Sequence, residues 1–138
     1  MIVPNLLVSN LPRSVEFYRS ALGFDLMMVL TATNEMIDEP GHPEAVFATM
    51  AWGDDQLMLQ TRAHLEDAGV SQPAPPAPVM SGSLYLRDFD FTERIGQIPQ
   101  AHIARQPTIA WYGMRELVIE DPDGYRIVLG HRSGPPPL

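Results

Sequence analysis

Apolar and polar positions in the first part of the chain change from a strand-like to a helical pattern. Residues 3–8 form a short apolar run that is typical of a strand. Asn10 and Pro12 follow, and these residue types favour the N-cap and the first turn of a helix. Residues 13–22 then carry apolar side chains at helical spacing, and Gly23 is a typical stop. The pattern therefore predicts a strand followed by one amphipathic helix.

Three further strands are predicted after this helix. They cover residues 24–31, 45–52 and 56–62, and residues 33–44 between the first two form a loop with prolines and glycine. The last two strands are joined by Gly53-Asp54-Asp55, a turn sequence typical of a hairpin.

Prolines then separate this part of the chain from a second, similar part. Residues 66–79 hold four prolines and few large apolar side chains, which predicts a linker in extended form. Beyond the linker we expect a strand, a short helix, a poorly patterned stretch that leads to Trp111, two strands and a flexible tail. Their ranges are 83–86 for the strand, 89–98 for the helix, 115–120 and 125–129 for the last strands, and 132–138 for the tail. Asp121-Pro122-Asp123-Gly124 predicts a tight turn between these last strands.

The same order of elements thus occurs twice: a strand, a helix, and three strands of which the last two form a hairpin. We interpret this as an α+β fold in which two βαβββ modules, residues 1–65 and 80–131, form a single domain over residues 1–131.

Alternation along the strands divides their side chains into two faces of different character. One face is entirely apolar and is expected to pack on the helices: Leu6, Val8, Leu57, Leu59, Leu84, Leu86, Leu117, Ile119, Ile127 and Leu129. The other face is mixed: Val3, Asn5, Gln56, Met58, Gln60, Ser83, Tyr85, Glu116, Glu120, Arg126 and Val128. Such a face is either in contact with solvent or lines a ligand cavity, and Met58, Tyr85 and Val128 are typical of the second case.

Charge and composition exclude several classes of function. The chain has 17 acidic residues against nine basic ones, and its formal net charge is −8. This balance argues against a nucleic acid or an anionic membrane as partner. The absence of cysteine excludes disulfides, a thiolate nucleophile and cysteine-ligated metals. No segment has the pattern of a signal peptide or a membrane span, so a cytoplasmic protein is expected.

Two motifs give the sequence a specific resemblance to a known family. Residues 10–18 (NLPRSVEFY) and 21–24 (ALGF) lie near the start, and residues 111–117 (WYGMREL) and 120–125 (EDPDGY) lie near the end. Together they resemble the vicinal oxygen chelate superfamily, which includes glyoxalase I, extradiol dioxygenases, and fosfomycin and bleomycin resistance proteins. The resemblance implies paired modules whose eight strands curl into a cup with the mixed face inside, and it implies a homodimer.

The resemblance also implies where a divalent metal is bound in the enzymes of this superfamily. The corresponding positions here are Val3, Met58, Ser83 and Val128, and none of them is a normal metal ligand. The positions two residues to either side, which face the same way, carry no histidine or carboxylate. We therefore expect no metal and no other cofactor.

A cup without a metal resembles the bleomycin resistance proteins, so the sequence predicts a metal-independent protein that binds a small molecule. The ligand is expected to be a cationic or aromatic antibiotic. The aromatic side chains of Trp52, Tyr85, Trp111 and Tyr112 could stack on it, and eight carboxylates oppose only Arg62 between residues 35 and 67. The expected ligand-binding residues are Asn5, Trp52, Met58, Gln60, Ser83, Tyr85, Trp111, Glu116 and Arg126.

Two alternatives stay open. The first is a lyase, isomerase or dioxygenase of the same superfamily, which either binds a metal or uses Glu116 or Glu120 as a base. The second is a regulatory or interaction module.

Overall fold

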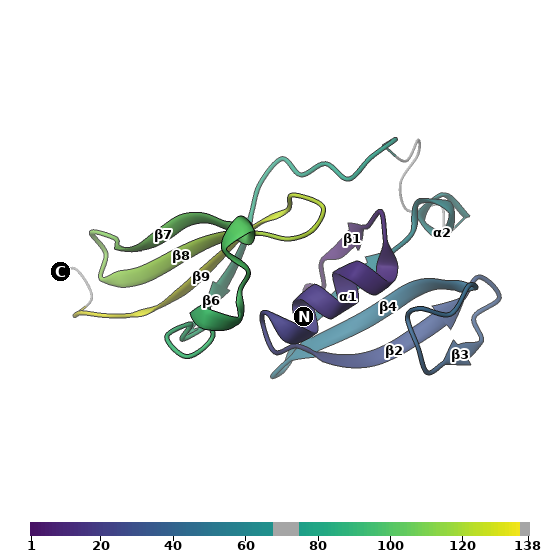
Figure 1. The fold of residues 1–138 in the computed structure, drawn as a ribbon, viewed down its shortest axis with the longest axis horizontal. Helices are drawn as coiled ribbons and strands as arrows, with labels where there is room; N and C mark the ends of the chain where they lie inside the picture. The colour runs from purple at the N-terminus through teal and green to yellow at the C-terminus, as the bar shows by residue number, and fades with distance from the viewer. Residues whose placement is uncertain (68–74, 136–138) are drawn as a thin grey trace. The chain divides into compact units, whose positions relative to one another are not determined.

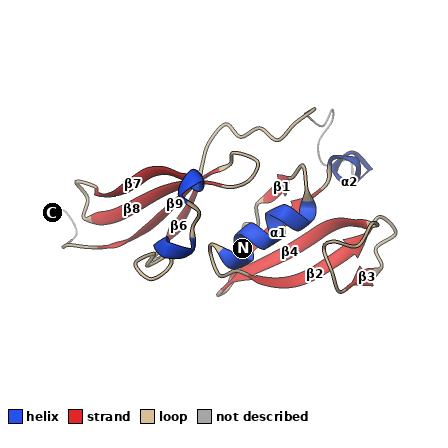
Figure 2. Cartoon of the chain, in the orientation of Figure 1, coloured by secondary structure: helices blue, strands red, loops and turns tan. Residues whose placement is uncertain are grey.

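A computed structural model describes residues 1–67 and 75–135 of the chain. The chain divides into two compact units, Met1–Val79 and Met80–Leu138, each built around its own sheet (Figures 1 and 2). Within the described residues, no helix is long and apolar enough to span a membrane.

The first unit contains a five-stranded sheet in the order β1-β5-β4-β2-β3. Strand β1 pairs with β5 in parallel, and the other neighbours are antiparallel. The strands are β1 (Asn5–Leu7), β2 (Asp25–Thr31), β3 (Met36–Ile37), β4 (Ala45–Trp52) and β5 (Asp55–Gln60). The helices are α1 (Leu11–Ser20) and α2 (Arg62–Asp67).

Helix α1 begins and ends where the sequence predicts it to within two residues. The Asn10 side chain accepts a hydrogen bond of 3.1 Å from the Arg13 amide and so caps the first turn. Gly23 adopts a φ of +75°, which allows its own amide to reach the Arg19 carbonyl at the C-terminal end.

The apolar face of this sheet packs on α1, as predicted. Helix α1 contacts β4 and β5, and Figure 1 shows it alongside β4. Val15 and Tyr18 of the helix are buried, and Leu57 and Leu59 of β5 are buried on the sheet.

Two elements of the first unit were not predicted. Strand β3 lies inside the predicted loop 33–44, and α2 overlaps the start of the predicted linker 66–79. Helix α2 is held by an ion pair of 3.0 Å between Arg62 and Glu66, and it buries Leu65 against Leu7. Residues 66 and 67 are therefore helical and not extended, because this short helix has its own apolar anchor in Leu65. Residues 68–74 of the linker lie outside the described residues.

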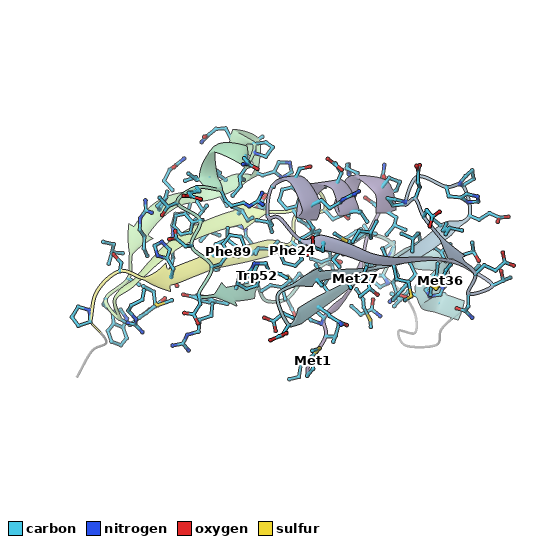
Figure 3. The ribbon with its side chains drawn as sticks, turned by 90° about the horizontal axis from the view of Figure 1, so that it is seen from below. Met1, Phe24, Met27, Met36, Trp52 and Phe89 are labelled. Carbon is cyan, nitrogen blue, oxygen red and sulfur yellow. The ribbon has the colours of Figure 1, made fainter. Side chains whose placement is uncertain are left out.

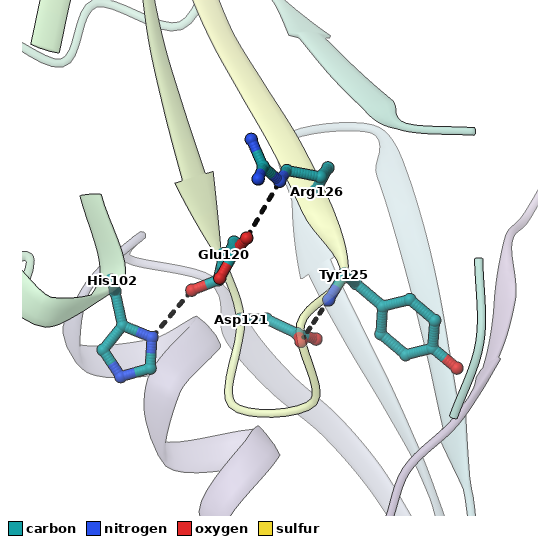
Figure 4. Close-up of polar contacts among 5 residues, drawn as sticks. All are labelled: His102, Glu120, Asp121, Tyr125 and Arg126. Atoms are coloured by element: carbon teal, nitrogen blue, oxygen red, sulfur yellow. Dashed lines mark hydrogen bonds and ion pairs between the residues drawn. The ribbon is translucent and has the colours of Figure 1, made fainter. Parts of the chain in front are cut away.

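The second unit contains a four-stranded sheet in the order β6-β9-β8-β7, in which β6 and β9 are parallel. The strands are β6 (Leu84–Arg87), β7 (Ile103–Ile109), β8 (Met114–Glu120) and β9 (Arg126–Arg132). The predicted turn between β8 and β9 is present (Figure 4). Asp121 Oδ1 accepts hydrogen bonds from the amides of Asp123 and Tyr125 at 2.8 and 3.0 Å, and Gly124 has a φ of +84°.

The predicted helix over residues 89–98 is wrong. The Asp90 side chain accepts a hydrogen bond of 2.9 Å from the Thr92 amide, and this local turn competes with helix formation. Only two short 3-10 helices follow, Ile95–Gln97 and Gln100–His102. Strand β7 occupies the poorly patterned stretch, where two register shifts and Pro107 remove the usual alternation.

Strand β9 extends into the predicted tail 132–138, because Arg132 still pairs with Met114. Residues 136–138 of that tail lie outside the described residues. The α+β class and the two strand–helix–strand modules are confirmed, with 3-10 turns in place of the second helix. The described residues form nine strands in two sheets and not eight, since β3 adds a short edge strand to the first sheet.

Candidate functional site

The mixed face predicted for the second half forms one side of the second sheet, which we call the open face. Strand pairing places Tyr85 beside Val128 and Val128 beside Val118, and it places Arg87 beside Gly130 and Gly130 beside Glu116. The opposite side is the buried core of this unit, as predicted. The open face comprises Tyr85, Arg87, Met114, Glu116, Val118, Glu120, Arg126, Val128, Gly130 and Arg132.

Glu116 lies near the middle of the open face and binds two tyrosine hydroxyls. Its side chain is buried, with 5% of the residue exposed. Tyr112 Oη donates a hydrogen bond of 2.6 Å to Glu116 Oε2, and Tyr85 is also hydrogen-bonded to this carboxylate. A buried carboxylate needs such donors, so the two phenols fix Glu116 in place.

Gly130 leaves the space through which Tyr85 reaches Glu116. A Cβ atom at position 130 would lie 2.7 Å from Cζ of Tyr85 and would collide with its hydroxyl oxygen. The ring of Tyr85 therefore rests directly on the backbone of β9. This close approach explains why a glycine stands inside a regular strand.

The environment of these phenols keeps them protonated. Burial raises the pKa of Tyr85 well above its ordinary value, and the hydrogen bond to Glu116 adds to this shift. The pKa of Tyr112 is also raised, chiefly by its hydrogen bond to Glu116. Both tyrosines therefore serve as hydrogen-bond donors and not as bases.

Tyr125 also has a raised pKa, and the raised pKa values of the tyrosines make the stability of the fold depend on pH. Burial raises the pKa of Tyr125 to about 12, and the nearby charges of Asp121 and Asp123 contribute. In the unfolded chain these phenols ionise near pH 10, so the unfolded state loses protons first as the pH rises. Stability is therefore fully retained below about pH 10 and falls progressively above it.

We expect the urea midpoint of unfolding to be clearly lower at about pH 11 than at about pH 8. The Tyr125→Phe variant should show a smaller difference between its midpoints at these two pH values. The chain has no lysine or cysteine, so tyrosines dominate titration in this range. Equal midpoints at the two pH values would contradict the raised pKa values.

A cavity of about 350 Å³ adjoins this cluster within the second unit. Its lining residues are Tyr85, Arg87, Tyr112, Met114 and Arg132. The guanidinium of Arg132 is held by a hydrogen bond of 2.7 Å from Nη1 to the Tyr112 carbonyl. The cavity has the size of a small-ligand site and combines aromatic, thioether and cationic groups.

The other predicted residues of the second unit lie outside the cavity lining. Arg126 forms an exposed ion pair of 2.9 Å with Glu120 (Figure 4). Ser83 is exposed just before β6. Trp111 is 86% exposed, although its ring contacts that of Tyr112 edge-on at 5.4 Å.

The predicted residues of the first unit have two different environments. Asn5 and Met58 are register partners on the mixed side of the first sheet, and Trp52 stacks on Phe24 at 6.4 Å (Figure 3). Gln60 is only 1% exposed. It lies in the row of Leu7 and Phe47, which α2 covers through the Leu7–Leu65 cluster and a ring contact of Phe47 with His64.

Tyr85 and Glu116, which the sequence analysis proposes as ligand-binding residues, belong to this cluster, as does Tyr112, which it names among the aromatic residues. It does not name three of the residues that line the cavity: Arg87, Met114 and Arg132. Arg87 and Arg132 lie just beyond the predicted strand ends at 86 and 129. Alternation extended by one residue along β6 and three along β9 would have placed both on the open face.

Two similar sheet units along one chain, each with one mixed face, are typical of a single class of protein. A family model matches residues 2–129, and the chain belongs to the Glyoxalase/Bleomycin resistance protein/Dioxygenase superfamily. No curated protein has a significant sequence match to the chain.

Solved structures with low sequence identity share the fold. A hypothetical protein from S. aureus, SA1046, has a TM-score of 0.69 and 20% identity, with coverage of 95% of this chain and 92% of that one. TnmS3, an antibiotic binding protein from Streptomyces sp. CB03234, has a TM-score of 0.63 and 24% identity, covering 95% and 93%. A lactoylglutathione lyase from Agrobacterium tumefaciens has a TM-score of 0.59 and 16% identity, covering 95% and 92%.

The residues at the metal positions implied by this superfamily do not fit a divalent ion. Those positions, Val3, Met58, Ser83 and Val128, offer two alkyl groups, a thioether and a hydroxyl. Strand register places Asn5 beside Met58 and Tyr85 beside Val128, which adds only an amide and a phenol. Within residues 1–67 and 75–135, no three histidine, aspartate or glutamate side chains come together as a metal site. The carboxylate of Glu116, on the same face, accepts two phenol hydrogen bonds.

Proposed function

We propose that this protein binds a small aromatic molecule on the open face of its second sheet, without a divalent metal. The observation that carries this proposal is the cavity beside the Tyr85–Glu116–Tyr112 cluster. Both tyrosine hydroxyls are engaged by Glu116, so the rings present their apolar surfaces to a ligand. Met114 adds a polarizable wall that adapts to a flat molecule.

The same groups are poorly suited to acid–base chemistry. Glu116 accepts hydrogen bonds from Tyr112 and Tyr85, and it is not among the residues that line the cavity. Glu120 pairs with Arg126 and lies outside the cavity. The alternative of a lyase, isomerase or dioxygenase therefore has less support than a binding function.

Sequestration of an aromatic antibiotic is the biological role we propose for this binding. The likeness in fold to TnmS3 is compatible with such a role, and the aromatic lining of the cavity supports it. A protein that binds a drug without altering it protects the cell in proportion to its own concentration.

The proposal can be tested with the Trp52→Phe variant, which retains Trp111 as its only tryptophan. Because Trp111 contacts Tyr112, its fluorescence should change when a ligand enters the cavity. Titration with a panel of aromatic antibiotics is expected to give saturable quenching for some members, unchanged by EDTA. The panel should include bleomycin-like and mitomycin-like compounds.

Trp111→Phe provides the matched control, since it removes the reporter near the cavity and leaves Trp52 in the first unit. It should bind with the same affinity by calorimetry but lose most of the fluorescence change. Absence of saturable binding across the panel, or binding that EDTA abolishes, would contradict the proposed function.

We also propose that the protein is a cytoplasmic homodimer. Exposed apolar side chains that a partner could cover support the dimer: Met27, Met36 and Ile109 are 58%, 72% and 67% exposed. Strand β7, an edge of its sheet, supplies Ile109. Sedimentation should give twice the mass of one chain, and a monomer at high protein concentration would refute the dimer.

A further inference from the structure

The cavity of the second unit carries the charge opposite to that of the chain as a whole. Two of its five lining residues are arginines and none is acidic, whereas the protein has a formal net charge of −8. The acidic residues that favoured a cationic ligand lie between positions 35 and 67, which belong to the first unit. The local charge of the cavity, and not the total charge, acts on a bound molecule at short range.

The two guanidinium groups lie at the same end of the open face. Arg87 is the register partner of Gly130 across the parallel pair β6–β9, and Arg132 is two residues further along β9 on the same side. Gly130, the register partner of Arg87, has no side chain, and the ring of Tyr85 occupies the space beside it.

The guanidinium group of Arg132 is held in one orientation. Its Nη1 donates to the Tyr112 carbonyl at 2.7 Å, and a Cβ atom at Gly113 would lie only 3.1 Å from this nitrogen. Gly113 has a φ of +84°, so glycine is required there on conformational grounds as well. One fixed N–H bond orients the planar group and leaves its other donors available.

Arg87 has no ion-pair or hydrogen-bond partner among residues 1–67 and 75–135. An arginine in a ligand-sized cavity without a carboxylate partner is suited to bind one from a ligand, since guanidinium and carboxylate groups form two parallel hydrogen bonds. Glu116 does not supply that partner, because its oxygens accept the hydroxyls of Tyr85 and Tyr112.

We propose that the natural ligand is a planar aromatic molecule with an anionic group, which Arg87 and Arg132 bind while its ring lies against Tyr85 and Tyr112. This inference rests on the proposed binding function and specifies the chemical class of the ligand. A carboxylate is the simplest such group, because its two oxygens match the paired N–H donors of a guanidinium group. A cationic ligand would be repelled by the two arginines.

Three isosteric probes test the inference by isothermal titration calorimetry: 2-naphthoate, neutral 2-naphthamide and cationic 2-naphthylmethylamine. Naphthoate is expected to bind at least about tenfold more tightly than the amide or the amine, because neither of these forms the charged hydrogen bond between carboxylate and guanidinium. Its affinity should fall with added salt, and that of the amide should not.

Arg87→Gln and Arg132→Gln should each weaken naphthoate binding about tenfold and leave naphthamide binding unchanged. Arg126→Gln is the matched control, since Arg126 lies on the same face of β9 but pairs with Glu120 outside the cavity. This variant should bind like the natural protein, and melting curves should show all three variants folded.

The outcomes separate this inference from the proposed function. Equal binding of all three probes, or preference for the amine, overturns the anionic ligand and leaves an aromatic-binding protein. Loss of affinity in Arg126→Gln equal to that in Arg87→Gln also overturns it, because the effect then reflects total charge. Failure of all three probes, with binding of some members of the antibiotic panel, overturns the anionic ligand alone. Failure of the probes and of the whole panel overturns both proposals.

Discussion

Replacing Glu116 by glutamine is expected to shift the ionisation of Tyr112 to lower pH and to destabilise the protein. The hydrogen bond to Glu116 is the largest cause of the raised pKa of Tyr112, so loss of the negative charge should bring that pKa back towards its ordinary value. The glutamine side chain would also place its NH2 group, a donor, against one of the two tyrosine hydroxyls, which are donors as well. We expect a loss of about 1–2 kcal/mol in the free energy of unfolding.

Absorbance titration of tyrosinate measures the first effect, and urea unfolding measures the second. Tyr85 should respond less than Tyr112, because burial is the main cause of its raised pKa. Glu120→Gln is the control: this glutamate occupies the same strand face but forms an exposed ion pair, whose loss should cost less than about 0.5 kcal/mol. An unchanged tyrosine titration in Glu116→Gln would show that the carboxylate does not hold the phenols.

Replacing Gly130 by alanine is expected to displace Tyr85 and to weaken ligand binding by about tenfold or more, as the Tyr85 ring forms part of the cavity wall. The backbone at Gly130 is open to any residue, so alanine should by itself favour the strand. The new methyl group nevertheless occupies the position of the Tyr85 ring. We expect a net loss of about 1 kcal/mol of stability in the natural background.

Gly130→Ala made in the Tyr85→Ala background isolates this steric effect of the Tyr85 ring. With the ring removed, Gly130→Ala should become neutral or stabilising by up to about 0.5–1 kcal/mol. Gly96→Ala is the matched control in the same unit, because a Cβ atom there meets nothing within 4 Å. If Gly130→Ala has the same effect in both backgrounds, contact with Tyr85 is not the reason for the glycine.

Elements with strong local signals could be predicted from the sequence. Helix α1 has a side-chain cap at Asn10 and a glycine with positive φ at its end, and both act within a few residues. The Asp121–Gly124 turn is similar, since one carboxylate binds two nearby amides. Such interactions depend little on the rest of the fold.

Elements whose form depends on tertiary contacts could not be predicted in this way. The region from Phe89 to Ile98 has apolar residues that suit a helix, but the bond from Thr92 to Asp90 and burial of Phe91 favour turns. Strand β7 is held by pairing with β8, across two register shifts that hide its alternation in the sequence.

The alternation of side chains along the strands helped to predict which residues of the site share a sheet face, whereas their spacing in the sequence did not. It placed Tyr85 and Glu116 on one face, where the structure brings them into contact. Tyr112 precedes β8, so no strand period could assign it, and its contact with Glu116 arises from the loop before that strand. The burial of Gln60 depends on α2, an element that the proline-rich composition nearby concealed.

Helix α2 has a consequence for how many molecules one chain can hold. The two halves repeat the same architecture, yet α2 covers the row of Leu7, Phe47 and Gln60 in the first, while the second keeps its cavity. The row that α2 covers is therefore closed to a ligand of the kind proposed for the second unit. A saturation stoichiometry of one ligand per polypeptide is the expected result, and the first half is then free to diverge in sequence without loss of recognition.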